Sequence, residues 1–345
     1  MKFMPAIAVV TQSTRLAGLK ARWATAGAAA FRLRQVRAHA GVLPAVAGKG
    51  KGRARPPLEE TRVARLAGFG EYEDEDVTYQ RTLAELRREL DLGYPLSFVD
   101  RGFLPNFQFG RCIAVVVVGQ DGLVANTAKY VARADTLAGK PLPIVAVNPD
   151  PSRIDGILLP FHARQARRAL LRTLENRARI REVTLAEVSL NDGQQLLAFN
   201  DLFVGVGSHV SARYTLHVSG RAEAQSSSGL IVATGAGSTG WLSSMCNMVA
   251  GFVHWQGGRI RPSIRLDWED PRLVWVVREP FRSKHSDADL VAGFLEPGQS
   301  LVVESLMPTG GVIFSDGVEA DFLEFNSGTI ATIAVSAHRA RLVVG

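Results

Sequence analysis

The chain of 345 residues is 46% hydrophobic and 21% charged, an ordinary globular composition that argues against global disorder. Its formal net charge of +7 attracts phosphate-bearing partners in general, without choosing among nucleotides, nucleic acid and anionic lipid. The two cysteines, Cys112 and Cys246, are far apart and lie in no metal-ligand spacing, so a disulfide framework or zinc site is not expected and a reducing compartment is favoured.

The N-terminal segment and the hydropathy of the chain bear on membrane association. The opening MKFMPAIAVV has a short apolar run, but it lacks a small-residue cleavage site and breaks into a polar turn. It therefore predicts a first buried strand rather than a signal peptide. No apolar stretch approaches the roughly 20 residues that are needed to cross a bilayer. We expect no membrane partner and a cytoplasmic location.

Residues 1–160 alternate between strand-like and helix-like segments. The run CIAVVVV has no polar face, as expected of a parallel strand that is buried on both sides. Strands are predicted at 6–10, 95–100, 112–118 and 143–150, and helices at 14–40, 77–93 and 126–137. This alternation predicts a doubly wound, Rossmann-like α/β nucleotide-binding domain.

Residues 41–58, GVLPAVAGKGKGRARPPL, are rich in glycine, proline and basic residues. They predict a mobile basic surface loop. The alternative is a basic arm for nucleic acid, with its charge concentrated at 49–55. The segment has no aromatic side chain for stacking on bases, so any such binding would be electrostatic and unspecific. We expect no specific nucleic-acid partner.

The pattern changes after about residue 160. A basic helix is predicted at about 162–181, and the Asn-Asp-Gly at 191–193 between two apolar runs is a strong hairpin signal. Short strands then continue to the C-terminus, with one helix near 240–253. Residues 161–325 are therefore predicted to form a β-rich, sandwich-like domain, and further strands are predicted in 326–345.

The first motif with chemical content is Gly119-Gln120-Asp121-Gly122, at the end of the buried strand. Ligands of open parallel sheets bind outside the carboxyl ends of the strands, and glycines and helix N-terminal amides suit a phosphate there. The Asp121 carboxylate would repel phosphate unless it holds Mg²⁺ or accepts a proton from an attacking hydroxyl. The alternative is a tight turn in which Asp121 is the helix N-cap.

The second motif is Gly235-Ala236-Gly237-Ser238-Thr239-Gly240, between a strand and a helix. Glycines and hydroxyls at a helix start indicate a phosphate or ribose cradle. The motif is neither a Walker A loop, because no lysine follows, nor the Rossmann fingerprint, because the glycine spacing differs. The alternative is an N-capped turn.

The third motif is Asn200-Asp201, which interrupts an apolar strand. An amide and a carboxylate together can bind an adenine edge or a ribose diol. A turn or a β-bulge is the alternative interpretation.

These motifs, in this order, resemble those of the NAD kinase family, which carries Gly-Gly-Asp-Gly-Thr, then Asn-Glu, then Thr-Pro-Thr-Gly-Ser-Thr-Ala-Tyr, then Asp-Gly-Gln. The resemblance spans roughly residues 110–335. The related lipid kinases share the first motif but fit the second less well. The matching segments here are Gly119–Leu123, Asn200–Asp201, Thr234–Trp241 and Asp316–Val318.

The resemblance implies an α/β nucleotide domain (1–160), a β-rich NAD-binding domain (161–325) and a chain end (326–345) that returns to the first domain. It also implies phosphoryl transfer from ATP to the 2′-hydroxyl of the adenosine ribose of NAD, with Mg²⁺, in a homo-oligomer formed through the β domain. Asp121 falls on the catalytic aspartate. Acceptor-binding positions would be Gly122, Asn126, Asn200, Asp201, Thr239, Gly240, Trp241, Ser243 and Ser244, and phosphate-cradle positions Gly119, Gln120, Gly235, Gly237 and Ser238.

The chain departs from the family pattern mainly at the phosphate-donor end. Gln120 replaces a glycine, Leu123 a threonine and Val318 a glutamine, and Ser228 replaces the aspartate before Gly229. A non-glycine residue does not easily adopt positive φ. We therefore expect a rebuilt loop, with Gln120 in an ordinary extended conformation and its amide near ligand phosphate, rather than a strained backbone.

The segment Arg-Glu-Pro-Phe-Arg-Ser-Lys-His at 278–285 supplies candidate donor contacts from Arg282 and Lys284. Arginine and lysine stabilise developing phosphoryl charge. The alternative is a solvated basic loop.

The first functional hypothesis is an NAD kinase-like phosphotransferase that uses ATP or another polyphosphate donor. The second is a dinucleotide-binding sensor or regulatory protein without turnover. The third is a superfamily kinase that acts on a lipid or sugar hydroxyl.

Overall fold

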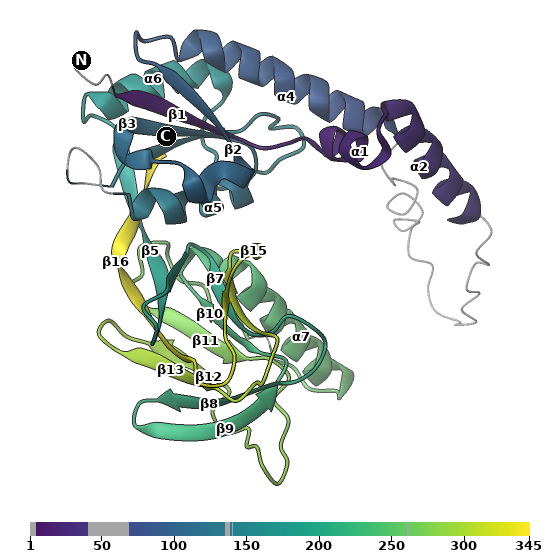
Figure 1. Cartoon of the computed structure of the whole chain (residues 1–345), viewed down its shortest axis with the longest axis vertical. Coiled ribbons are helices and arrows are strands. Elements are labelled where there is room, and N and C mark those ends of the chain that lie inside the picture. The colour runs from purple at the N-terminus through teal and green to yellow at the C-terminus, as the bar shows by residue number, and fades with distance from the viewer. Residues whose placement is uncertain (1–4, 41–68, 135–138, 140, 261) are drawn as a thin grey trace.

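The computed structural model describes residues 5–40, 69–134, 139, 141–260 and 262–345. The predicted basic loop at 41–58, with its charged stretch at 49–55, lies outside the described residues. Figure 1 shows two bodies joined by long strands. The chain starts in the α/β body, builds the β-rich body next, and ends in the α/β body again.

The helices of the described residues differ from the predicted ones at their ends and at one break. The single helix predicted at 14–40 is two helices, because Ala24 adopts a positive φ of 64° between them. The helix predicted to extend to 181 ends earlier, and Asn176 adopts a left-handed turn conformation before the next strand begins. The helices are α1 (Arg15–Trp23), α2 (Ala26–Ala40), α4 (Phe69–Glu89), α5 (Asp121–Ala132), α6 (Ala163–Leu174) and α7 (Trp241–Trp255), with short 3-10 turns η1 (Arg101–Asn106), η2 (Phe109–Arg111) and η3 (Ala236–Thr239).

The α/β body is built on a parallel sheet in the order β2-β1-β3-β4, to which the end of β16 adds a further parallel strand. Buried side chains of α4 and α6 pack on one face of this sheet, and those of α5 pack on the other. The apolar run of β3 is buried as predicted. The strands are β1 (Ala6–Thr11), β2 (Leu96–Asp100), β3 (Cys112–Val118), β4 (Pro143–Val147) and β16 (Ile330–Val344).

The β-rich body has two facing sheets. One has the order β12-β11-β10-β7-β14-β15, and the other contains β5, β6, β8, β9, β13 and the first part of β16. A core of buried residues that includes Tyr214, Leu230 and Trp275 fills the space between them. The strands are β5 (Arg179–Leu190), β6 (Gln195–Ala198), β7 (Asp201–Val206), β8 (Ala212–Val218), β9 (Arg221–Ser227), β10 (Leu230–Ala233), β11 (Leu273–Val277), β12 (Ala292–Leu295), β13 (Ser300–Ser305), β14 (Gly311–Ser315) and β15 (Val318–Glu324).

Strands β5 and β16 connect the two bodies. They pair antiparallel along nearly their whole length, and β16 pairs with β13 in its first part and with β4 in its last part. The predicted fold class, with a chain end that returns to the first domain, is therefore confirmed. The two strands expected after residue 326 are one long strand with a register shift between Val335 and Arg339. The predicted boundaries at 160 and 325 stay predictions.

Two further expectations concern local structure. The Asn-Asp-Gly turn joins β5 to β6 as a hairpin, and Gly193 has a φ of 89°, which only glycine adopts without strain. The helices of the described residues include none that is long and apolar enough to cross a bilayer.

Candidate functional site

A cavity of about 920 Å³ lies at the carboxyl ends of β1 and β3. The chain leaves β1 toward β2 on one side and leaves β3 toward β4 on the other, so these two strands form the topological switch point of the sheet. Open α/β sheets bind their ligands at this position. The lining residues are Gln12, Ser13, Arg15, Glu75, Asp100, Arg101, Gly102, Pro105, Gln120, Asn126, Tyr130, Gly317, Val318, Glu319 and Asp321.

Gln120 precedes α5 and lines this cavity. Its φ of −107° and ψ of 167° are those of an ordinary extended residue, as expected, and a contact of its amide with ligand phosphate stays a prediction. Gly119 is tightly enclosed, since a Cβ there would lie 2.8 Å from Leu123 Cδ2. Leu123 itself is only 1% exposed and belongs to the core, so a threonine hydroxyl at this position would be buried. Gly122 is exposed, with open space where a Cβ would stand.

Asp121 is the first residue of α5, and Gln120, not Asp121, is the N-cap. The alternative interpretation of Asp121 as a capping residue is therefore wrong. Its carboxylate instead accepts hydrogen bonds from the backbone N–H groups of Leu158 at 2.7 Å and Ile157 at 3.3 Å. These bonds hold the loop that follows β4. An ionised carboxylate can accept more than two hydrogen bonds, so acceptor capacity remains for a ligand hydroxyl.

Asn126 lies one and a half turns along α5 and also lines the cavity. Its side chain is 3% exposed, and its Oδ1 has no hydrogen-bond partner among the described residues. A buried polar atom without a partner costs about 1–3 kcal/mol. Such an atom at a cavity wall is typical of a residue whose partner is a ligand.

Asn200 and Asp201 lie where the chain passes from β6 to β7, and they meet the turn between β14 and β15. The Asp316 carboxylate accepts hydrogen bonds from the backbone N–H groups of Phe199 at 3.1 Å, Asn200 at 2.6 Å and Asp201 at 3.4 Å. The N–H of Asp316 donates to the carbonyl of Asp201 at 3.0 Å. The next residue, Gly317, lines the cavity.

Two carboxylates in this turn have perturbed pKa values. Burial and then the charge of Asp316 raise the pKa of Asp201 to about 7. Removal from water also raises the pKa of Asp316, although Lys129 and the three backbone N–H groups oppose the shift. The pair therefore holds a proton near neutral pH. Asp316 begins the segment Asp316–Val318 that matches the family's Asp-Gly-Gln, a resemblance that implied no role for this residue.

Lys129 and Tyr130 on α5 reach the β14–β15 hairpin from the other side, a contact that the sequence analysis missed. Lys129 is buried, donates to Ser315 Oγ at 2.7 Å and lies 3.7 Å from the Asp321 carboxylate. Burial lowers the pKa of Lys129 against the opposing effect of nearby carboxylates. The Tyr130 hydroxyl donates to Asp321, and burial followed by this bond raises the pKa of Tyr130. The sequence gives one indication of this contact. Most residues around Lys129 in α5 are apolar, which indicates that the lysine lies on a buried helix.

The glycine-rich loop after β10, predicted as a phosphate cradle, packs closely against the chain's own backbone. A Cβ on Gly235 would stand 1.8 Å from the Asp267 carbonyl oxygen, and one on Gly237 would stand 2.0 Å from the Asn200 carbonyl oxygen. Ser238 Oγ is buried and bonds to Gly235 and Leu266. These residues allow close approach to the chain's own backbone, and a phosphate contact for them stays a prediction.

The helix α7 that follows contributes Trp241 to a second cavity of about 650 Å³. Phe203 stacks on Trp241 with ring centroids 5.7 Å apart, and the Arg278 guanidinium lies 5.1 Å from the Trp241 ring. Glu319 lines both this cavity and the cavity at the strand ends, so the two are adjacent.

Of the predicted site residues, Gln120, Asn126 and Trp241 line these two cavities. Asp121, Gly122, Asn200 and Asp201 lie outside both linings, as do the remaining predicted positions. Thr239, Gly240 and Ser244 are exposed at the start of α7, and Ser243 lines a different cavity together with Ser238. Arg282 forms ion pairs with Asp289 and Asp287, and Lys284 is exposed. The basic residue of that segment which does reach a cavity is Arg278.

No family model matches the sequence, and no curated protein matches it significantly. Solved structures do match the fold. Yeast NADH kinase, in complex with NADH, superposes with a TM-score of 0.54 over 100% of this chain and 84% of its own, at 13% identity. An NAD kinase from Archaeoglobus fulgidus, in complex with ATP, gives 0.51 over 76% and 88%, at 19% identity. The chain therefore has the two-domain fold of the NAD kinases, and the resemblance drawn from its motifs is confirmed at the level of fold.

Proposed function

We propose that the protein is an NAD kinase-like phosphotransferase, which moves the terminal phosphate of ATP or another polyphosphate to the 2′-hydroxyl of the adenosine ribose of NAD. The observation that carries the proposal is the cavity at the topological switch point, with the buried, unpaired Asn126 in its wall. The fold supports it, because solved proteins of this fold are named for the same chemistry.

In this proposal Asp121 accepts the proton of the attacking ribose hydroxyl, and the two backbone N–H groups on its carboxylate fix its orientation. Asn126, Asn200 and Asp201 bind the acceptor dinucleotide. The Trp241 ring, backed by Phe203, provides a surface on which a base of the dinucleotide stacks.

Mg²⁺ fits this site as an ion that arrives with the donor phosphates. Among the described residues no group of three or more His, Cys, Asp or Glu side chains could hold a metal ion together. Asp100, Glu319 and Asp321 line the cavity as separate carboxylates. Mg²⁺ commonly uses one or two protein carboxylates and completes its shell with water and substrate phosphates, where it neutralises developing charge.

The deciding experiment incubates the purified protein with NAD, ATP and Mg²⁺ and follows NADP formation. We expect turnover, and we expect Asn126→Ala to reduce kcat/KM by about tenfold or more through the loss of a buried hydrogen bond. Asn247→Ala, at an exposed position of α7, is the matched control and should behave as wild type. Absence of NADP with every tested polyphosphate donor would reject the proposal.

A second candidate function is dinucleotide binding without turnover. It is favoured by the two hydrogen bonds that already engage Asp121 and by the close packing of Gly235 and Gly237 on the chain's own backbone. Calorimetric titration with NAD separates the two functions, since tight binding without product supports the second.

We also propose that the protein is a homo-oligomer formed through the β-rich body. Helix α7 lies along one side of the β-rich body (Figure 1), and its residues Phe252 and Trp255 are 60% and 80% exposed. Large exposed apolar side chains on one helix face are typical of an interface. Light scattering after gel filtration should give a multiple of the chain mass, and Phe252→Ser with Trp255→Ser should reduce it to the monomer. A monomeric wild type would contradict this proposal.

The unpaired Cys112 and Cys246 support the reducing, cytoplasmic compartment that composition led us to expect.

A further inference from the structure

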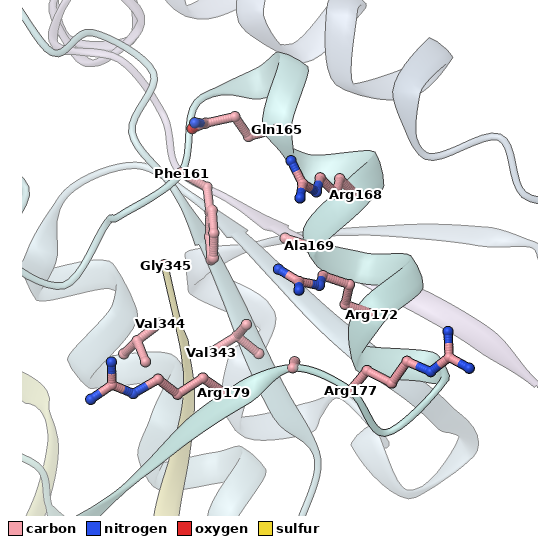
Figure 2. A pocket seen from close by; sticks show the side chains of 11 residues that line it. Phe161, Gln165, Arg168, Ala169, Arg172, Arg177, Arg179, Val343, Val344 and Gly345 are labelled. Carbon is pink, nitrogen blue, oxygen red and sulfur yellow. The ribbon is translucent and has the colours of Figure 1, made fainter.

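A second concave site of the α/β body carries an unusual concentration of arginine. It lies between α6 and the last residues of β16, has a volume of about 320 Å³, and shares no residue with the cavity at the switch point. Figure 2 shows Arg168 and Arg172 directed from α6 toward the strand end, Arg179 on the opposite side with its guanidinium group extending past Val344, and Arg177 pointing away. We call Arg168, Arg172 and Arg179 the arginine triad.

The arginines of α6 differ in whether their side chains have partners in the protein. On the side that faces α4, Arg164 forms an ion pair with Glu85 at 3.0 Å, and Arg167 donates to the Glu89 and Asp91 carbonyl groups. On the other side, the guanidinium groups of Arg168 and Arg172 form no hydrogen bond or ion pair with any described residue. The chain therefore satisfies the arginines of one side and leaves those of the other available.

Arg179 completes the triad from a separate element. It is the first residue of β5 and pairs through its backbone with Val344 of β16, which places it across the cavity from α6. Its side chain also has no hydrogen-bond or ion-pair partner within the described part of the chain. Arg177, which points away, has its own partner in Glu175 at 3.3 Å.

The electrostatics of the site favour an anion. Arg168 and Arg172 direct their guanidinium groups into the space between α6 and the strand end, and Arg179 lines its far edge. None of the lining side chains is acidic, and Gly345 brings the terminal carboxylate of the chain into the same lining. Neighbouring like charges repel one another, and a bound anion offsets that repulsion. Guanidinium groups bind phosphate oxygens in a bidentate manner, so several of them together favour a group with several phosphate oxygens.

The floor of the site is apolar. Phe161, Ala169 and Val343 are buried in the core beneath it, and the Phe161 ring lies between the two arginines of α6 and the strand end (Figure 2). A volume of about 320 Å³ is at the small end of the range for small-molecule pockets. Such a concave site, closed by a strand end on one side, suits a compact ligand better than a nucleic-acid backbone, which needs an extended basic track.

We propose that the arginine triad is a binding site for a small molecule that carries a pyrophosphate group. Arg168 and Arg172 bind the two phosphate groups from one side, the exposed side chain of Arg179 turns toward the ligand from the other, and the apolar floor accommodates the organic part of the ligand. The site is separate from the one that the proposed phosphotransferase reaction uses, and it does not depend on that reaction.

Inorganic pyrophosphate is the probe for this site, because it presents the shared chemistry without an organic part. Calorimetric titration of the full chain at low salt and without Mg²⁺ should show binding. The double variant Arg168→Gln with Arg172→Gln should weaken it by about 100-fold, at roughly tenfold for each charge-assisted contact. Arg164→Gln removes the same charge from the same helix outside the pocket and should weaken binding by less than about threefold.

Three results would overturn the proposal. The first is an equal loss of pyrophosphate affinity in the double variant and in Arg164→Gln, which would indicate unspecific attraction to a basic helix. The second is a loss of pyrophosphate affinity in Asn126→Ala with no loss in the double variant, which would place pyrophosphate only in the cavity at the topological switch point. The third is tighter binding of a single-stranded oligonucleotide than of pyrophosphate, with the same sensitivity to the double variant, which would make this a nucleic-acid surface.

Discussion

Replacing the buried Asp201 by asparagine should change how the stability of the protein depends on pH. Asp201 is 7% exposed, and its pKa is raised from 3.8 to about 7 by burial and by the charge of Asp316. Asparagine has nearly the same shape and resembles the protonated carboxyl group. Asp201→Asn therefore removes the titration while it keeps the packing.

The sign follows from proton binding. Between about pH 4 and pH 7 the folded protein retains a proton on Asp201 that the unfolded chain has released. The folded state thus binds more protons, and the free energy of unfolding of the wild type falls as pH rises through this window. Each unit of pKa shift corresponds to 1.36 kcal/mol. A shift from 3.8 to about 7 gives a loss of up to about 4 kcal/mol by pH 8, and Asp201→Asn avoids that loss.

Urea unfolding of both proteins from about pH 4 to about pH 8 measures this difference. The two free energies of unfolding should be similar at the acid end, and the variant should become more stable by a few kcal/mol at the alkaline end. Asp155→Asn removes a charge from an exposed side chain and should follow the wild type at every pH. A variant that is less stable than the wild type at pH 8 would refute the reasoning, because it would mean that the ionised carboxylate stabilises the turn.

Three other substitutions test the site and the loop beside it. Asp121→Asn should lower turnover by about 10²–10⁴-fold and leave NAD binding nearly unchanged; a rate near that of the wild type, in steady-state assays of NADP formation, would remove Asp121 from the mechanism. Asn200→Ala should weaken NAD binding by about 1–3 kcal/mol and ATP binding less, measured by calorimetry, and equal losses for both ligands would mean that Asn200 is structural. Gly237→Ala should destabilise the fold by about 2 kcal/mol or more, because the new Cβ would stand 2.0 Å from the Asn200 carbonyl oxygen. Gly251→Ala, on α7 with open space around it, should leave stability unchanged or raise it by about 0.5–1 kcal/mol in the same urea series, and equal losses in both glycine variants would contradict the packing role.

Two substitutions would restore the family pattern in the Gly119–Leu123 segment, and the structure shows that they differ in their expected effect on stability. Gln120→Gly changes an exposed residue in an extended conformation, so we expect it to be tolerated. Leu123→Thr would instead place a hydroxyl in the core. The double change is therefore a test of stability as well as of turnover, and Gln120→Gly alone is the cleaner probe of the loop.

The sequence by itself determined the elements and their order. CIAVVVV has no polar face, and a strand without a polar face must be covered on both sides, which α4 with α6 and α5 do. The Asn-Asp-Gly sequence predicted the hairpin between β5 and β6, because the turn requires a positive φ that glycine, here Gly193, adopts easily. These features depend on residues that are close in the sequence, where periodicity and turn chemistry are informative.

Only the tertiary structure decided what the site residues contact. The Asp121 carboxylate meets the N–H of Leu158, and the Asp316 carboxylate meets the N–H of Asn200, across 37 and 116 positions of the chain. Position 237 must be glycine because the carbonyl oxygen of Asn200 leaves no room for a Cβ there. A phosphate bound close to the backbone would require glycine for the same reason, so the sequence does not distinguish the two. A motif records which backbone conformation and side chains are present. It does not record which group approaches them, because that depends on the paths of distant loops and on the packing of the two bodies.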